Sequence, residues 1–281
     1  LLLIDGNIGR KGAGLCPVRG HSNVQGDRTV GINHNPSESF QKSLNEVFGI
    51  KPIENSGYDS VESVRMMNAG NSSIFLSMGG NFLSAMSDTH STANALRKCD
   101  LTVHISTKPN RSHLIPGKVG LILPCLGRTE ADYTGGSEQF ITVENSMGIV
   151  HKSVGGANPA SPDLRSEVAI IVGIAKSIVN YENLHDINWD LFTEHYDNIR
   201  QKIELVVPGF EGYNERCRED GGFYLPNPPR DYRIFETETG KATFIVHNLE
   251  SISASENEYV MMTIRSHDQY NTTIFGTNDR Y

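Results

Sequence analysis

The side chains best suited to chemistry lie close together near the start of the chain, in residues 14–31 (GLCPVRGHSNVQGDRTVG). Arg19 offers a planar, permanently charged fork for a carboxylate or a phosphate. The glycines and polar residues after it can let the main chain approach a ligand and bind heteroatom-rich rings; they are Gly20, Ser22, Asn23, Gln25 and Gly26. This combination predicts a site for a large, polar, phosphate-bearing ligand. An ordinary surface loop is the alternative, because the same residue types dominate turns.

Two further polar loops follow short apolar runs that read as strands. The first holds Gly79, Gly80 and Asn81, which could admit a nucleotide phosphate or sugar, although a plain loop would look the same. The second presents hydroxyls, an amide and two cations at Ser106, Thr107, Lys108, Asn110 and Arg111. Because ligands of open α/β sheets sit beyond the carboxyl ends of the strands, these loops predict a site for a guanosine ribose and diphosphate.

The elements around these loops predict an α/β fold, with a Rossmann-like, mostly parallel sheet and flanking helices. Helices are expected at residues 37–48, with Ser37 as the N-cap, at 60–69 and at 89–98. Strands are expected at residues 74–77, 101–105 and 119–123, and a hairpin around 145–148. Another helix should open at Ser161 and carry an apolar stripe from Leu164 to Val179.

The later part of the chain predicts less regular structure. A helix is expected near residues 189–202, and the breaker-rich residues 208–230 should wrap the surface, with Cys217 as a loop thiol. From residue 233 onward the pattern becomes β, with runs at 242–247 and 258–265. The expected division is a cofactor-proximal loop region (1–36), an α/β dinucleotide-binding domain (37–182), a helical and irregular extension (183–235) and the start of a C-terminal β domain (236–281).

Composition narrows the classes of partner. The 281 residues carry a formal net charge of −8, which argues against broad binding of nucleic acid or anionic membranes. There is no apolar run near the ~20 residues of a membrane helix and no signal-peptide pattern, so the protein is expected to be cytoplasmic and not membrane-inserted. The 4 cysteines have no CxxC spacing and are expected to be free thiols, with no metal site formed by this chain alone. The absence of an initiator Met suggests a piece of a longer protein.

Four ordered segments resemble molybdopterin oxidoreductases of the formate dehydrogenase and dimethyl sulfoxide reductase family. They are CPVRGHSNVQG at residues 16–26, MGGN at 78–81, LPCLGRTE at 123–130 and RSHDQYNTT at 265–273. The particular branch resembles formate dehydrogenase-like α subunits, including a subgroup associated with acid resistance. Two departures stand out: His21 occupies a position that is often an amide in formate dehydrogenases, and Ser106 or Thr107 replaces the usual acidic residue after the second strand.

The resemblance implies a central-to-C-terminal part of an enzyme that carries bis-molybdopterin guanine dinucleotide with molybdenum or tungsten. Arg19 would hold a small substrate anion near the metal, and a [4Fe-4S] cluster in the missing N-terminal region would pass electrons to a partner. The last region would begin a C-terminal β-barrel whose first loop approaches the pterins through Arg265, Ser266, His267, Asp268 and Gln269. In the third segment, Arg128 and Glu130 are expected to form a structural ion pair. The piece alone should be inactive.

Two other classes of function stay open. One is a nucleotide-binding or regulatory module that keeps the fold without redox chemistry. The other is an α/β enzyme for a different dinucleotide, although no GxGxxG sequence supports it. Independently of that choice, the His-Asp pair at residues 267–268 could form a structural hydrogen bond instead of binding cofactor.

Overall fold

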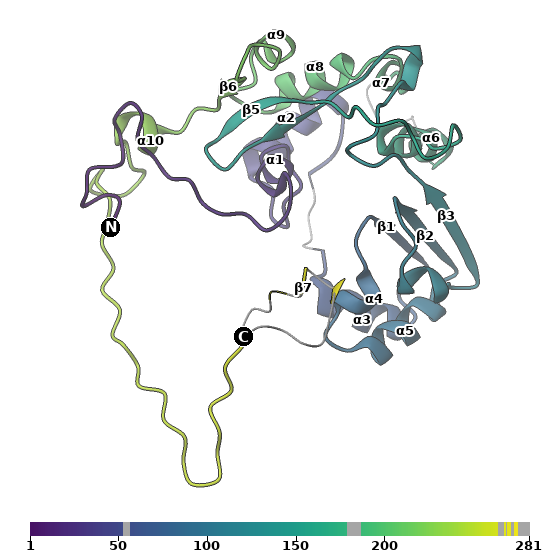
Figure 1. The fold of residues 1–281 in the computed structure, drawn as a ribbon, viewed down its shortest axis with the longest axis horizontal. Coiled ribbons are helices and arrows are strands. Elements are labelled where there is room, and N and C mark those ends of the chain that lie inside the picture. Colours follow the sequence, from purple (N-terminus) through teal and green to yellow (C-terminus); the bar gives the residue numbers. More distant parts are fainter. Residues whose placement is uncertain (53–56, 179–186, 264–266, 268, 271–272, 275–281) are drawn as a thin grey trace.

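The computed structural model describes residues 1–52, 57–178, 187–263, 267, 269–270 and 273–274. Its regular elements form a mixed α/β structure with a parallel sheet and a separate antiparallel sheet (Figure 1). Within the described residues the strands close no barrel. The expected α/β class is therefore confirmed, whereas the mostly parallel arrangement holds for one sheet only.

The parallel sheet consists of β1 (Ile74–Met78), β2 (Leu101–Ser106) and β3 (Val119–Pro124), in that spatial order. These are the three strands expected from the apolar runs. The connection from β1 to β2 contains α4 (Phe82–Ala85) and α5 (Thr89–Lys98), and a short 3-10 helix, η1 (Arg111–Leu114), precedes β3. Since all three strands run the same way, the loops after β1 and β2 meet at one edge of the sheet.

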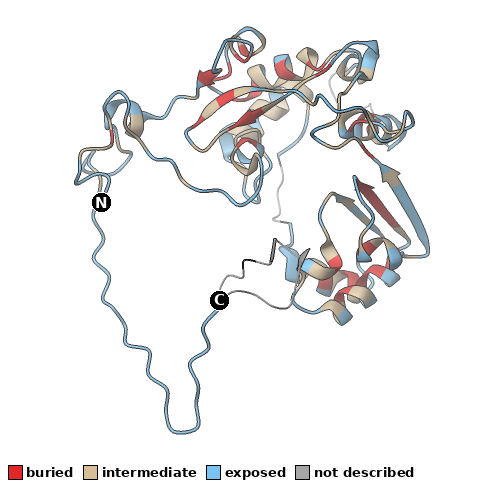
Figure 2. Cartoon of the chain, in the orientation of Figure 1, coloured by how far each residue is buried: buried red, intermediate tan, exposed pale blue. Residues whose placement is uncertain are grey.

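Two helices cover this sheet and supply its core. They are α3 (Ser60–Asn68) and α5, whose N-terminal amides are capped by the carboxylates of Asp59 and Asp88 at 2.8 Å each. Their contact buries Val64, Met67, Ala95, Leu96 and Cys99 (Figure 2). The predicted helices at 60–69 and 89–98 are confirmed to within one residue.

The antiparallel sheet is built from the predicted hairpin. Strand β4 (Ile141–Glu144) pairs with β5 (Ile149–Ser153), and β5 pairs with the short β6 (Phe223–Tyr224). Helices α1 (Val24–Thr29), α2 (Glu38–Phe48) and α8 (Asp197–Val206) lie with this sheet (Figure 1). The expected Ser37 cap of α2 is confirmed, because the Ser37 hydroxyl accepts from the Phe40 amide at 3.2 Å.

Helix α6 (Glu167–Ile178) begins six residues later than Ser161, where the sequence predicted its start. The reason is tertiary: Arg165 forms a parallel bridge with Cys125 beside β3, so the chain is extended there. Ser166, whose hydroxyl accepts from the Ala169 amide at 3.1 Å, supports the first turn instead. Of the expected apolar stripe, Val179 lies outside the described residues.

The predicted helix at 189–202 is divided in two. Helix α7 (Asp190–Glu194) ends at His195, whose extended backbone (φ −157°, ψ 133°) separates it from α8. Beside α7 lies the 3-10 turn η2 (Thr134–Gly136). The Tyr196 hydroxyl donates to Asp132 at 2.5 Å, which anchors the start of α8 and explains the break.

The region 208–230 does more than wrap the surface. It contains α9 (Tyr213–Arg216), β6 and the start of α10 (Pro228–Tyr232), and it fills the core of the antiparallel half. Cys217 is fully buried beside that core and is not an exposed loop thiol. The aromatic side chains among the breakers explain this difference, because Phe210, Tyr213 and Phe223 contact one another edge to face.

The β pattern of the last region is only partly realised. Residues 242–262 are irregular and almost wholly exposed, so the strands expected at 242–247 and 258–265 do not form in the described residues. A strand needs a neighbour to satisfy its backbone, and among the described strands none pairs with this segment. A small hairpin of β7 (Gln269–Tyr270) and β8 (Thr273–Ile274) follows. No helix in the described residues is long and apolar enough to cross a membrane.

Candidate functional site

The predicted anion-binding arginine lies at the end of a short chain of side-chain hydrogen bonds. Arg19 donates from Nε and Nη2 to the amide oxygen of Gln25, at 3.4 and 3.2 Å. The Gln25 amide nitrogen donates to Glu144 Oε1 at 2.7 Å, and the Thr29 hydroxyl donates to Glu144 Oε2 at 2.5 Å. Gln25 and Thr29 lie on α1, one turn apart, and Glu144 ends β4. Side chains from helix α1 and strand β4 therefore jointly fix the position of Arg19.

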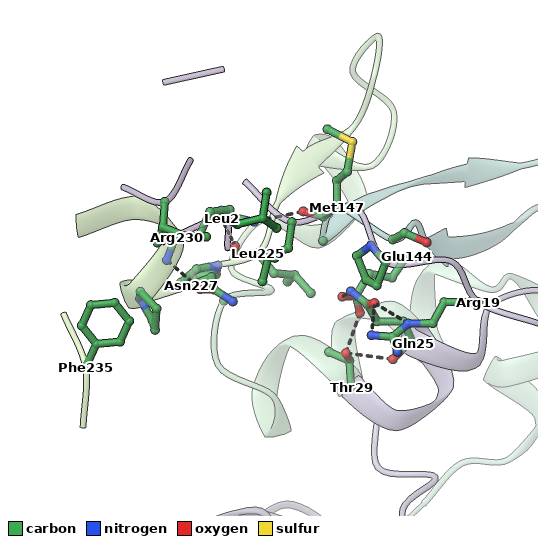
Figure 3. A pocket seen from close by; sticks show the side chains of 18 of the residues that line it. Leu2, Arg19, Gln25, Thr29, Glu144, Met147, Leu225, Asn227, Arg230 and Phe235 are labelled. Carbon is green, nitrogen blue, oxygen red and sulfur yellow. Dashed lines mark hydrogen bonds between the residues drawn. The ribbon is translucent and has the colours of Figure 1, made fainter. Parts of the chain in front are cut away.

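These side chains line a cavity of about 920 Å³ (Figure 3). Arg19, Gln25, Thr29 and Glu144 lie together on one side of it, whereas Arg230 and Phe235 lie on the other. Apolar side chains form much of the wall; they include Leu1, Leu2, Leu3, Ile8, Leu15, Met147, Leu225 and Phe235. The Arg230 guanidinium is engaged by Asp231 and by the carbonyls of Met147 and Leu225. Arg19, in contrast, forms no ion pair among the described residues.

Asn23 and Gly26 serve local structure. Asn23 has a left-handed backbone (φ 61°), and its side-chain oxygen accepts from the Glu144 amide at 2.9 Å. A Cβ at the buried Gly26 would lie 2.2 Å from that same oxygen. A larger residue at position 26 would displace the Asn23 side chain from its bond to the Glu144 backbone amide, so glycine favours this contact between α1 and β4. Nearby, Ser22 accepts from the Arg128 guanidinium, and Gly20 has open space at its Cα.

The predicted nucleotide loops meet at the carboxyl edge of the parallel sheet. Gly79 and Gly80, directly after β1, have φ values of 65° and 70° and open space where a Cβ would be. The Asn110 side chain, from the loop after β2, donates to the Gly80 carbonyl at 2.8 Å. Asn81 accepts a longer bond of 3.4 Å from Ser112. The structure therefore brings together two loops that the sequence separates by about 30 residues.

The remaining predicted residues at this edge differ in whether their side chains are free to bind a ligand. Ser106 is buried at the end of β2, whereas Thr107, Lys108 and Arg111 are exposed. The side chains of Lys108 and Arg111 form no hydrogen bond or ion pair with another described residue. Two cations and a glycine turn at a strand edge fit a diphosphate, because positive charge and close main-chain approach are what that group needs. The Asn110 side chain, by contrast, is occupied by structural bonds.

The loop after β3 connects the two groups of predicted residues. The backbone amide of Cys125, directly after β3, donates to the Ser106 carbonyl at 3.2 Å, and the Arg128 guanidinium donates to the Ser22 hydroxyl. The expected ion pair between Arg128 and Glu130 does not form. Glu130 instead accepts from the amides of Gly127 at 2.5 Å and Ala160 at 2.7 Å, and these bonds lower the pKa of its carboxyl. The carboxylate is used to fix the loop.

The C-terminal group of predicted pterin contacts is largely untested by geometry. Arg265, Ser266 and Asp268 lie outside the described residues. His267 is exposed, and Gln269 begins β7. Their assignment stays a prediction, as does the division of the chain into four domains.

The cysteines have the properties of structural thiols. Cys99, Cys125 and Cys217 are buried, and Cys16 is exposed, with all four free. Burial, together with the nearby carboxylates of Glu167 and Glu130, raises the pKa of Cys125 to about 11, so this thiol stays protonated near neutral pH. In the described part of the chain no group of three or more His, Cys, Asp or Glu side chains is arranged to hold a metal ion.

Glu144 and Thr29 are site residues that the sequence did not single out. Glu144 comes just before the predicted hairpin turn, and its side chain is only 8% exposed. A carboxylate at the end of an otherwise apolar strand was the available signal, because a buried charge requires partners. Those partners lie 115 and 119 residues away, so spacing could not reveal them.

Comparison with known proteins places the chain among larger homologues. No protein-family profile matches it. An uncharacterized oxidoreductase of Mycobacterium tuberculosis is 50% identical over 281 residues, all of this chain and 36% of that protein. The Escherichia coli protein YdeP is 46% identical over 284 residues, again all of this chain and 37% of YdeP. YrhE, a putative formate dehydrogenase of Bacillus subtilis, is 24% identical over 270 residues, 92% of this chain and 26% of YrhE.

Homologues that bear the name oxidoreductase therefore cover this chain from end to end. The chain spans about a third of the length of these Mycobacterium tuberculosis and Escherichia coli relatives.

Proposed function

We propose that this chain is part of an oxidoreductase that resembles formate dehydrogenase and carries bis-molybdopterin guanine dinucleotide with molybdenum or tungsten. The full-length protein would oxidise or reduce a small substrate by two electrons, and the piece alone would be inactive. The similarity to YrhE along 92% of the chain supports this reading, together with the relatives named as oxidoreductases. The proposal places the [4Fe-4S] cluster, and the contact with an electron-transfer partner, in other parts of that protein.

The observation that carries the proposal is the state of Arg19. Its guanidinium borders a cavity, has a neutral amide as its partner and forms no ion pair among the described residues. An arginine whose charge is not already compensated can bind the carboxylate or other oxyanion of a substrate through its remaining N–H groups. The apolar side chains of the cavity wall would limit water around that ion pair and strengthen it.

The carboxyl edge of the parallel sheet fits the nucleotide end of the cofactor. Lys108 and Arg111 would neutralise the diphosphate, and Gly79 and Gly80 would allow it to approach the main chain. When bound, the cofactor supplies the two-electron exchange with the substrate, and the protein's part is to orient and to balance charge. The loop after β3 would keep this edge in register with the segment that carries Arg19, because it is hydrogen-bonded to both.

Substitution of Arg19 in the full-length protein tests its role. With formate as the probe and a redox dye as the electron acceptor, Arg19→Ala should raise the KM or lower the turnover at least about tenfold, since a charge-assisted contact is lost. Metal content should stay as in the parent protein. Arg28→Ala, an exposed arginine at the end of α1, is the matched control and should change neither quantity. An unchanged KM together with unchanged turnover per bound metal in Arg19→Ala would show that Arg19 does not bind the substrate.

A further inference from the structure

We propose that Glu144 and Gln25 are positioning residues that orient Arg19 and keep its charge available for a small anion. This inference rests on the proposed function, because it assigns Arg19 to the substrate. It adds a buried carboxylate on β4 and a neutral amide on α1 as the parts that set the geometry.

The orientation of the Gln25 amide follows from the chemistry of Glu144. A carboxylate only accepts hydrogen bonds, so Gln25 must turn its amide nitrogen toward Glu144, at 2.7 Å. The amide oxygen then faces the other way, where Arg19 donates to it twice. Reversal of the amide would place its oxygen against the carboxylate and its N–H groups against the guanidinium. The carboxylate therefore determines which atom Arg19 meets.

A neutral residue between the two charges has a specific consequence. The amide oxygen orients the guanidinium without cancelling its charge, whereas a carboxylate in the same place would form an ion pair and compete with a substrate anion. The charge of Glu144 is instead satisfied by two donors, Gln25 and Thr29, at 2.7 and 2.5 Å. Arg19 thus keeps its net charge and further N–H groups beyond those that donate to Gln25, and it lines the cavity (Figure 3).

Backbone contacts of α1 and β4 support this arrangement. The Glu144 amide donates to the Asn23 side chain at 2.9 Å, and Gly26 is packed against that same side chain. Glu144 itself is paired with Val150 in the β4–β5 hairpin. Positioning by elements of regular structure gives tighter geometry than positioning by loops. A purely structural alternative is that Glu144 only fastens α1 to β4. In that case, any exchange of residues that restores the hydrogen bonds should also restore formate binding.

The test compares variants of the full-length, cofactor-loaded protein. The readouts are the dissociation constant for formate by calorimetry, metal content and thermal stability. In Glu144→Gln, a single amide oxygen replaces the two carboxylate oxygens that accept from Gln25 and Thr29. Because one of these hydrogen bonds is lost, formate binding should weaken about fivefold to tenfold, equivalent to about 1–1.4 kcal/mol. Glu138→Gln, an exposed carboxylate just before β4, is the matched control and should bind formate as the parent does.

A reciprocal exchange separates positioning from fastening. When Gln25→Glu is combined with Glu144→Gln, every hydrogen bond can form again, because the amide now on β4 can donate to the carboxylate now on α1 and can accept from Thr29. Thermal stability and metal content should recover, but formate binding should stay at least about fivefold weaker because Arg19 would now face a carboxylate. Binding restored to the parent value, or normal binding in Glu144→Gln, would overturn the positioning role. If Arg19→Ala itself binds formate normally, the proposed function fails at Arg19, and the positioning role fails with it.

Discussion

Arginines in this structure fall into two groups according to the partner that each one meets. Arg200 is 4% exposed and pairs with Asp197, with its guanidinium over the ring of Phe140 at 4.0 Å. These contacts stabilise the fold and leave the Arg200 guanidinium unable to bind a ligand. Arg19 is exposed, and among the described residues its guanidinium donates only to the neutral oxygen of Gln25. Arg28 also forms no ion pair among the described residues, so an uncompensated charge alone does not mark a ligand-binding arginine. Arg19 is distinguished because it also borders the cavity.

His104 gives a pH dependence at the scale of one residue. It is 4% exposed on β2, its ring centroid lies 4.6 Å from that of His113, and its Nε2 has no hydrogen-bond partner among the described residues. Burial, and secondly the proximity of His113, lower the pKa of His104. The unfolded chain therefore takes up a proton below a pH of about 6.5 while folded His104 stays neutral. The contribution of buried, neutral His104 to the free energy of unfolding is therefore complete above a pH of about 6.5 and becomes smaller as the pH falls.

His104→Leu should remove this contribution. The loss of stability between pH values of about 7.5 and 5.5, measured from urea denaturation midpoints of the full-length protein, should become smaller in the variant. His90→Leu is the matched control, because His90 is exposed on α5 and should leave the pH dependence unchanged. An equally steep decline in His104→Leu would mean that His104 does not titrate differently in the folded and unfolded states.

At the scale of elements, the sequence predicted the helices and turns whose positions depend on neighbouring residues. Ser37 and the apolar spacing after it predicted α2, and the turn at residues 145–148 predicted the β4–β5 hairpin. The start of α6 was not predictable, because Ser161 and Ser166 both offer a cap and a distant bridge to Cys125 decides between them. The site divides in the same way. The contact of Arg19 with Gln25 is local, whereas that of Gln25 with Glu144 depends on packing between α1 and β4.

The loop after β3 gives a prediction about packing between segments. A Cβ at Gly155 would lie 2.0 Å from the Glu130 carbonyl oxygen and 2.5 Å from its carbon, and backbone atoms cannot move aside easily. Gly155→Ala should therefore destabilise the protein by about 1–3 kcal/mol, as overpacked sites do. Gly156→Ala is a close control, because its Cβ would meet nothing within 4 Å. Equal thermal unfolding midpoints for the two variants would contradict the close approach of this loop.

At the scale of the whole molecule, this chain has exposed apolar side chains and an unpaired segment, which other parts of the full-length protein are expected to contact. Ile74, Leu76 and Met78 on β1 are 63%, 46% and 44% exposed, although parallel sheets are normally covered on both faces. Residues 242–262 extend away from the rest of the structure without pairing to any described strand (Figure 1). Since this chain spans only 36% of the Mycobacterium tuberculosis relative and 37% of YdeP, function is best measured in the full-length protein.

The most direct test of the proposed function is the composition of the purified full-length protein from a host that makes the cofactor. Metal analysis should find molybdenum or tungsten, and acid hydrolysis followed by chromatography should release about two guanine nucleotides for each metal atom, because the cofactor holds two guanosine diphosphate units. Lys108→Ala with Arg111→Ala should lower both quantities together, because these cations are proposed to hold one diphosphate. A folded protein that contains neither metal nor guanine nucleotide would contradict the molybdopterin assignment and favour a nucleotide-binding or regulatory module without redox chemistry.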